Sequence, residues 1–208
     1  MKMNFAVNSE YKFPSSFGLS RQESLRAIKQ FLVCSDWEKL TTIALEENLM
    51  QKNSVATAGR TFREIKRRLK KMSYQEMVYF LDAPLEEQNL LIWLTICRNY
   101  QIAYDFLESV IKERYEESRD EVTLRDFDSF MQEQSLWHEE INLLSEQSYL
   151  VVRKTVMRWF RELGVLSKDY KLEEPVISSS FFRFLQRECP DDIKFLPISR
   201  KTLRRLKQ

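Results

Sequence analysis

The chain has 208 residues, 43% of them hydrophobic, which is enough for one ordinary domain or two small ones. Its 33 Lys and Arg residues nearly balance 31 Asp and Glu residues, so net charge alone indicates no partner. Only 3 Gly and 5 Pro are present, which disfavours an all-β fold because such folds need many tight turns. The three Gly are isolated, which excludes a glycine-rich phosphate loop. One His and three scattered Cys make a zinc site untenable, and we expect no cofactor.

The sequence contains no candidate membrane segment. Its longest uncharged run is the ten residues from Gln88 to Cys97, about half the length that spans a bilayer. The N-terminus lacks the apolar stretch of a secretion signal, and an odd number of unpaired Cys is typical of a reducing compartment. We therefore expect a cytoplasmic protein that has no membrane partner.

Helix signals recur along the first half of the chain. Capping boxes, in which a Ser and a Glu three residues later bond each other's backbone N–H, are predicted at Ser20–Glu23, Ser35–Glu38 and Ser73–Glu76. Apolar residues at helical spacing follow each box. Helices are expected after residue 20 and over about 36–48, 54–71, 74–82, 85–98 (buried on nearly all sides) and 100–117.

The stretch 53–72 is the most informative. Its apolar residues fall at spacings of 3 and 4, which predicts one continuous stripe on a helix capped by Ser54. The other faces carry seven Arg and Lys against one Glu, a net charge of +6. A solvated surface helix usually interleaves Glu at i,i+4, and this one does not. A role facing a polyanion is the favoured interpretation, with Arg63 and Arg67 expected to lie off the apolar stripe and to be dispensable for folding.

An acidic region follows, with eleven acids and four bases over residues 108–140. We place a boundary in its polar stretch, between an N-terminal helical half (1–118) and a C-terminal half (119–208). A helix is predicted from Thr123, a short one over 136–144, and a long one over about 146–163 ended by Gly164. Two short β-prone pieces follow and could form a β-hairpin wing. A further helix starts at Ser178 or Ser179, and the basic tail 198–208 is expected to be disordered.

Two segments therefore have the layout of a helix, a turn and a basic helix: residues 36–71 and residues 136–177, the second resembling a winged helix-turn-helix. A helix that enters a DNA groove keeps an apolar stripe on its support and offers cations to phosphates. We expect a compact, nearly all-α globule that binds duplex DNA mainly through phosphates. The four Trp (37, 93, 137 and 159) are interpreted as core residues.

Four alternatives stay open. The basic helix could dock on the acidic region 108–140 of the same or another molecule. In an interaction scaffold, the basic helix and this acidic region would instead both dock on partner proteins. The basic helix could also bind RNA. Finally, the chain could be a carboxylate nuclease, in which Mg²⁺ would need convergent acidic ligands from more than one element. The acids considered for that role are Glu113, Glu116, Glu117, Asp120, Glu121, Asp126 and Asp128.

The sequence resembles the BrxA family of bacteriophage-exclusion (BREX) defence systems. The resemblance runs in order through ESLRAIKQFL at 23–32, residues 36–69, LIWLTICRNYQIAYDFLESVIKERY at 91–115, residues 126–166 and the end at Phe195–Pro197. It implies an all-α protein with two helix-turn-helix elements that binds double-stranded DNA without catalysis and works in phage resistance with other BREX proteins. It implies no small-molecule substrate, no metal and no catalytic residue.

The predicted DNA-binding cations follow from both arguments. They lie on the two basic helices and the tail: Arg60, Arg63, Lys66, Arg67, Lys70, Lys71, Arg153, Lys154, Arg158, Arg161, Arg200, Lys201, Arg204 and Arg205.

Overall fold

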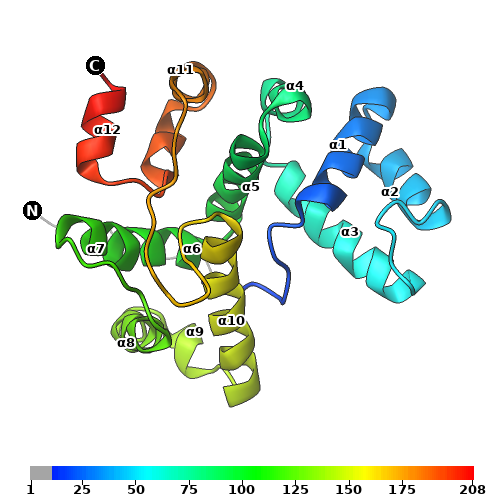
Figure 1. Ribbon diagram of the computed structural model, residues 1–208. Helices are drawn as coiled ribbons and strands as arrows, with labels where there is room; N and C mark the ends of the chain where they lie inside the picture. The colour runs from blue at the N-terminus through cyan, green and yellow to red at the C-terminus, as the bar shows by residue number, and fades with distance from the viewer. Residues whose placement is uncertain (1–10) are drawn as a thin grey trace, which may run out of the picture.

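The computed structural model describes residues 11–208, and within them every regular element is a helix (Figure 1). Residues 11–208 form twelve α-helices and no strand, a compact all-α fold as predicted. Among these residues, none of the helices combines the length and the apolar character that crossing a bilayer requires.

The first three helices pack on one another as a unit, which lies on the right in Figure 1. Its apolar stripes meet inside the unit, where Ile28, Leu40 and Phe62 are almost fully buried. A fourth helix packs against the first and leads to the molecular centre. The helices are α1 (Arg21–Cys34), α2 (Trp37–Glu46), α3 (Val55–Leu69) and α4 (Tyr74–Asp82).

The predicted capping boxes have different outcomes. The box of Ser73 and Glu76 is confirmed, with both reciprocal hydrogen bonds formed at the start of α4. The box at Ser20 is wrong: Ser20 is left-handed, at φ 57°, and its side chain caps nothing. The box at Ser35 is also wrong, because Asp36 accepts the first free N–H groups of α2.

The central helix α5 (Leu85–Asn99) is buried along most of its length, as predicted. The predicted helix over 100–117 is divided into α6 (Gln101–Phe106), a π-helical turn (Leu107–Ile111) and α7 (Lys112–Glu116). The inner face of this segment meets α8 and α10 through Phe106, whose ring lies 5.2 Å from that of Phe130 and 5.5 Å from that of Phe160.

The second half contains α8 (Leu124–Gln134), a short α9 (Glu139–Asn142) and α10 (Glu146–Glu162). Helix α9 covers only part of the predicted 136–144. Gly164 is left-handed, at φ 74°, and ends α10 as predicted. The wing is reduced to isolated antiparallel bridges, Leu166 to Leu172 and Glu121 to Lys171, and no strand forms among the described residues.

The chain ends with α11 (Ser179–Glu188), a 3₁₀ turn (Pro190–Phe195) and α12 (Arg200–Leu206). The expectation of a disordered tail is wrong, because Ser199 caps α12 and Leu203 and Leu206 pack against the core. One hydrophobic cluster includes residues on both sides of the boundary predicted at 118. Within it the Trp93 indole N–H donates to the Phe195 carbonyl at 2.7 Å.

The tryptophans only partly follow the prediction that all four belong to the core. Trp93 and Trp159 are fully buried, and Trp37 stacks on Phe31 at 4.1 Å. Trp137 is 78% exposed, beside Leu136 at 75% and ahead of Leu143 at 83%. Helix α8 ends before Trp137, so the side chain is carried by a turn and meets no neighbouring helix stripe.

Candidate nucleic-acid interface

The exposed face of α3 carries a row of cations. Arg60, Arg63, Arg67 and Lys70 are exposed and recur at spacings of 3, 4 and 3 residues. Residues at these spacings share one face of a helix. The buried stripe, made of Ala58, Phe62, Ile65 and Leu69, occupies the opposite face. The row can thus meet a polyanion while the stripe holds α3 on its support.

Two other predicted cations flank this row. Lys71 is exposed just beyond the end of α3. Lys66 points to α2, where its Nζ donates to Glu38 and to the Thr41 hydroxyl, each at 2.8 Å. The Lys66 ammonium lowers the pKa of the Glu38 carboxyl through this hydrogen bond and its charge. Lys66 therefore ties α3 to α2, and the prediction that it faces DNA does not match its geometry.

A buried ion-pair network lies beneath the row. The Glu64 carboxylate accepts from Arg68 Nε at 2.7 Å and from the Tyr100 hydroxyl at 2.8 Å. Arg68 Nη1 donates onward to the Gly18 carbonyl at 2.7 Å. Burial, and then the Glu64 charge, raise the pKa of Tyr100, which keeps the phenol protonated as a donor.

Arg67 belongs to both the row and the network. Its guanidinium is about half exposed, yet it pairs with Glu64 and contacts the Tyr100 hydroxyl. The same group lies 5.0 Å from the centre of the Tyr100 ring. Arg67 lies off the apolar stripe as expected, but it also binds a buried carboxylate, so that its dispensability for folding stays a prediction.

A segment that the sequence did not single out lies between α3 and α10. The Phe17 carbonyl accepts from the Trp159 indole N–H at 2.8 Å, and the Leu19 N–H donates to Glu162 of α10. Arg68 of α3 holds the Gly18 carbonyl from the other side. In the sequence, the isolated Gly18 is the one residue that could have drawn attention to this segment. The structure shows why a glycine is needed there: a Cβ would lie 2.5 Å from the Glu162 carboxylate.

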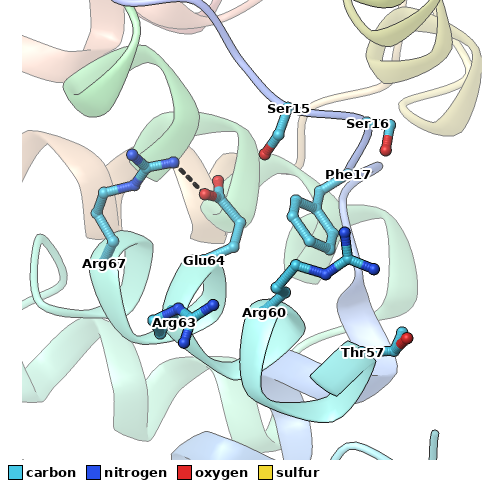
Figure 2. A pocket seen from close by; sticks show the side chains of 8 residues that line it. All are labelled: Ser15, Ser16, Phe17, Thr57, Arg60, Arg63, Glu64 and Arg67. Atoms are coloured by element: carbon cyan, nitrogen blue, oxygen red, sulfur yellow. Dashed lines mark hydrogen bonds and ion pairs between the residues drawn. The ribbon is translucent and has the colours of Figure 1, made fainter. Parts of the chain in front are cut away.

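A pocket of about 560 Å³ opens between this segment and α3. Figure 2 shows the Arg60, Arg63 and Arg67 side chains rising from α3 on one side, with the Phe17 ring beside Arg60 and the Ser15 and Ser16 hydroxyls above. Arg60 and Arg63 have no acidic partner among residues 11–208. The pocket therefore presents two unpaired guanidinium groups, an Arg67–Glu64 ion pair, hydroxyl groups and one aromatic ring.

Helix α10 differs, because its predicted cations are mostly engaged. Arg153 Nη1 binds the Asp128 carboxylate of α8 at 2.9 and 3.0 Å. Arg158 pairs with Glu162 one turn away, and the Arg161 guanidinium lies 4.9 Å over the Tyr170 ring. Lys154 alone is exposed without an acidic partner among the described residues.

The cations of the C-terminal helix lie elsewhere on the molecule. Helix α12 begins where the Ser199 and Arg200 N–H groups donate to Glu174 at 2.6 Å and to Glu116 at 2.8 Å. Figure 1 shows α12 and α3 at opposite ends of the fold. The structure therefore does not bring the fourteen predicted cations onto one face. Those on α12 are all exposed: Arg200, Lys201, Arg204 and Arg205.

Of the acidic residues considered for a nuclease, Glu113, Glu117 and Asp126 line one pocket, in which Arg114 pairs with Glu117 and Asp126. Asp126 caps α8 and pairs with Arg114, and Asp128 pairs with Arg153. Within the described part of the chain, one group of three potential ligand side chains converges: Glu76, Cys189 and Asp192. Arg98 already occupies that group and pairs with both carboxylates, which makes it a structural ion-pair network.

Comparisons with known proteins give a family and a fold. A protein-family model described as BrxA matches residues 14–188. A solved structure, an uncharacterized protein from Magnetospirillum magneticum, superposes with a TM-score of 0.74. The match covers 88% of this chain and 95% of that one at 18% sequence identity, which shows a shared fold. No curated protein matches the sequence.

Proposed function

Since the chain belongs to the BrxA family and so to BREX phage defence, we propose that it binds duplex DNA through α3 and catalyses no reaction. One observation carries this proposal: the row of Arg60, Arg63, Arg67 and Lys70 stands opposite the buried stripe of α3. Duplex DNA is a regular array of negative charge, and a row of cations on one exposed helix face is suited to contact its phosphates.

The position of the row favours phosphate contacts over base readout. In a helix-turn-helix, the first residues of the recognition helix reach the base edges. Here the first turn of α3 holds Val55, Ala56 and Thr57, and the cations begin at Arg60 and continue past the end of the helix. Residues 47–54, which connect α2 to α3, also exceed the usual turn of three to four residues. We therefore propose binding that tolerates many sequences.

Binding to a labelled blunt duplex, followed by fluorescence anisotropy over a salt series, tests the proposal. Four phosphate contacts predict that doubling the salt concentration lowers affinity about tenfold. Arg60→Glu combined with Arg63→Glu should lower affinity at least tenfold and flatten the salt dependence. Both side chains are exposed and unpaired among the described residues, so the fold should be kept.

The matched control is Lys29→Glu with Arg183→Glu, which makes the same charge change at exposed positions of α1 and α11. If the two double variants bind DNA with equal affinity, the loss is explained by net charge alone, and the assignment of DNA binding to α3 is overturned. Absence of binding at low salt would overturn DNA binding itself. Stronger competition by structured RNA than by duplex DNA would reassign the same helix to RNA.

A second candidate function is a scaffold within the defence complex. The exposed Leu136, Trp137 and Leu143 at the turn around α9 favour it, since large apolar side chains gathered at a surface mark interaction sites. The test is co-purification with other BREX proteins at a salt concentration that abolishes DNA binding. Trp137→Ser should then lose the partner. Unchanged co-purification of that variant would remove this surface as the docking site.

A further inference from the structure

The Phe17 side chain is unusual among the aromatic residues of the fold. It is half-buried on the wall of the pocket beside α3, and it does not belong to the hydrophobic core cluster. Within residues 11–208 its ring makes no aromatic pair and lies under no cation. Figure 2 shows the ring between Arg60 and the chain at Ser15 and Ser16.

The backbone of Phe17 is fixed while its ring is left at the surface. Its carbonyl accepts from Trp159 at 2.8 Å, and its N–H donates to the Ser15 carbonyl at 2.7 Å. Neither bond involves the side chain. The residue is of intermediate burial and also lines the pocket, so part of the apolar surface of the ring faces the open space. The ring offers an apolar face to whatever enters the pocket.

The rest of the pocket defines the chemistry of that ligand. Arg60 and Arg63 supply unpaired guanidinium groups, which favour phosphate oxygens, while Arg67 in the same lining is paired with the Glu64 carboxylate. The Ser15, Ser16 and Thr57 hydroxyls add short hydrogen-bonding groups. The volume of about 560 Å³ exceeds what one phosphate fills and suits a small molecule with a ring. A nucleotide combines a phosphate with a flat heteroaromatic base, and so matches both parts of this lining.

We propose that this pocket takes one unstacked nucleotide, with its base on Phe17 and its phosphate at Arg60 and Arg63. The inference rests on the proposed DNA binding and deepens it. A base inside a duplex is stacked on both faces and cannot reach Phe17, so the nucleotide comes from an unpaired strand next to a duplex or from free solution. Stacking on an aromatic side chain is sequence-tolerant, because every base has such a face.

A blunt duplex and the same duplex with a short single-stranded extension distinguish the two modes of binding. The wild type should bind the extended duplex about tenfold more tightly, since one stacked base contributes an effect of that order. Phe17→Ala should abolish the preference and keep the affinity for blunt duplex, because the ring lies off the exposed face of α3. Phe17→Trp should retain the preference. The fluorescence of 2-aminopurine placed in the extension should change on binding to the wild type and not on binding to Phe17→Ala.

Trp137→Ala is the matched control, because it removes an exposed aromatic ring outside the pocket. A second arm uses a deoxynucleoside monophosphate as the probe. Binding that depends on Phe17, without a preference for extended DNA, would assign the pocket to a free nucleotide. Equal affinity of the wild type for both duplexes, with no nucleotide binding, would overturn the inference and leave duplex binding intact. If the protein binds the nucleotide through Phe17 but does not bind blunt duplex, the proposed role of α3 in duplex binding is wrong and the pocket assignment stands.

Discussion

Helices α3 and α10 both appear in the sequence as cation-rich amphipathic helices, yet they use their cations differently. In α3 a single acid, Glu64, lies on the flank and engages Arg67 and Arg68, so most of the exposed row remains free. In α10 the neighbouring helix supplies Asp128 and the helix itself supplies Glu162, which engage Arg153 and Arg158. The number of cations on a helix is therefore a poor guide to an interface. The carboxylates packed around the helix determine which of its cations stay free to bind a ligand.

The two helices also differ in how their charges are buried. The Glu64–Arg68 pair is almost completely shielded from water, whereas Asp128 and Arg158 are about half exposed. Breaking a buried pair leaves an uncompensated charge in a medium of low polarity, and exposed pairs contribute little. The network under α3 should therefore govern stability, and the pairs on α10 should not.

The largest effect is expected from Glu64→Gln. It removes the charge that compensates Arg68, and it should lower the free energy of unfolding by about 3–5 kcal/mol. The measurement is chemical denaturation followed by circular dichroism. Asp128→Asn on the α10 side is the matched control and should cost less than about 1 kcal/mol. Equal losses in the two variants would contradict the contrast between the helices.

Gly18→Ala should come next, because it tests the segment that joins the two helices. The new Cβ would lie 2.5 Å from the Glu162 carboxylate and 2.8 Å from Arg158 Cζ. Glu162 would have to release the Leu19 N–H, which should cost about 2 kcal/mol as a lost charge-assisted hydrogen bond. Gly59→Ala is the control, since the nearest atom to its Cβ is at 3.5 Å. A loss no larger than that of the control would show that the segment adapts freely.

Asp126→Ala should have a smaller effect that depends on pH. Burial acts to raise the pKa of Asp126, but hydrogen bonds from Thr123 and Arg114 outweigh it and lower the pKa below its ordinary value. A lowered pKa in the folded protein means that the stabilisation is present at neutral pH and is lost as the pH falls. The variant should lose about 1 kcal/mol at pH 7, typical of a helix cap, and the difference should vanish in acid. A difference that is constant with pH would refute the assignment.

The smallest effect is expected from Lys154→Glu, the one exposed and unpaired cation of α10 among the described residues. Duplex affinity measured by anisotropy should change about twofold or less. Arg63→Glu, which makes the same charge change on α3, should lower affinity several-fold because it removes a phosphate contact from the row. A larger loss in Lys154→Glu would make α10 the principal DNA-binding helix and reverse the comparison.

Local patterns alone identified most of the helices. The stripe and Ser54 cap of α3, the buried α5, the box at Ser73 and the left-handed Gly164 all follow from spacing and backbone preference. One failure has a local cause and another has a tertiary one. Asp36 competes with Ser35 for the same N–H groups, and the hydrophobic contacts of Leu203 and Leu206 order a tail whose composition resembles a disordered end.

The amino-acid sequence by itself determined that this protein is helical and that α3 has one face for burial and one for charge, because helical periodicity is a property of neighbouring residues. Only the tertiary structure decided which cations remain free. Arg68 donates to the Gly18 carbonyl, Arg153 meets Asp128, and Phe17 lies beside Arg60 and Arg63. These partners come from residues far apart along the chain, and no local spacing brings them together.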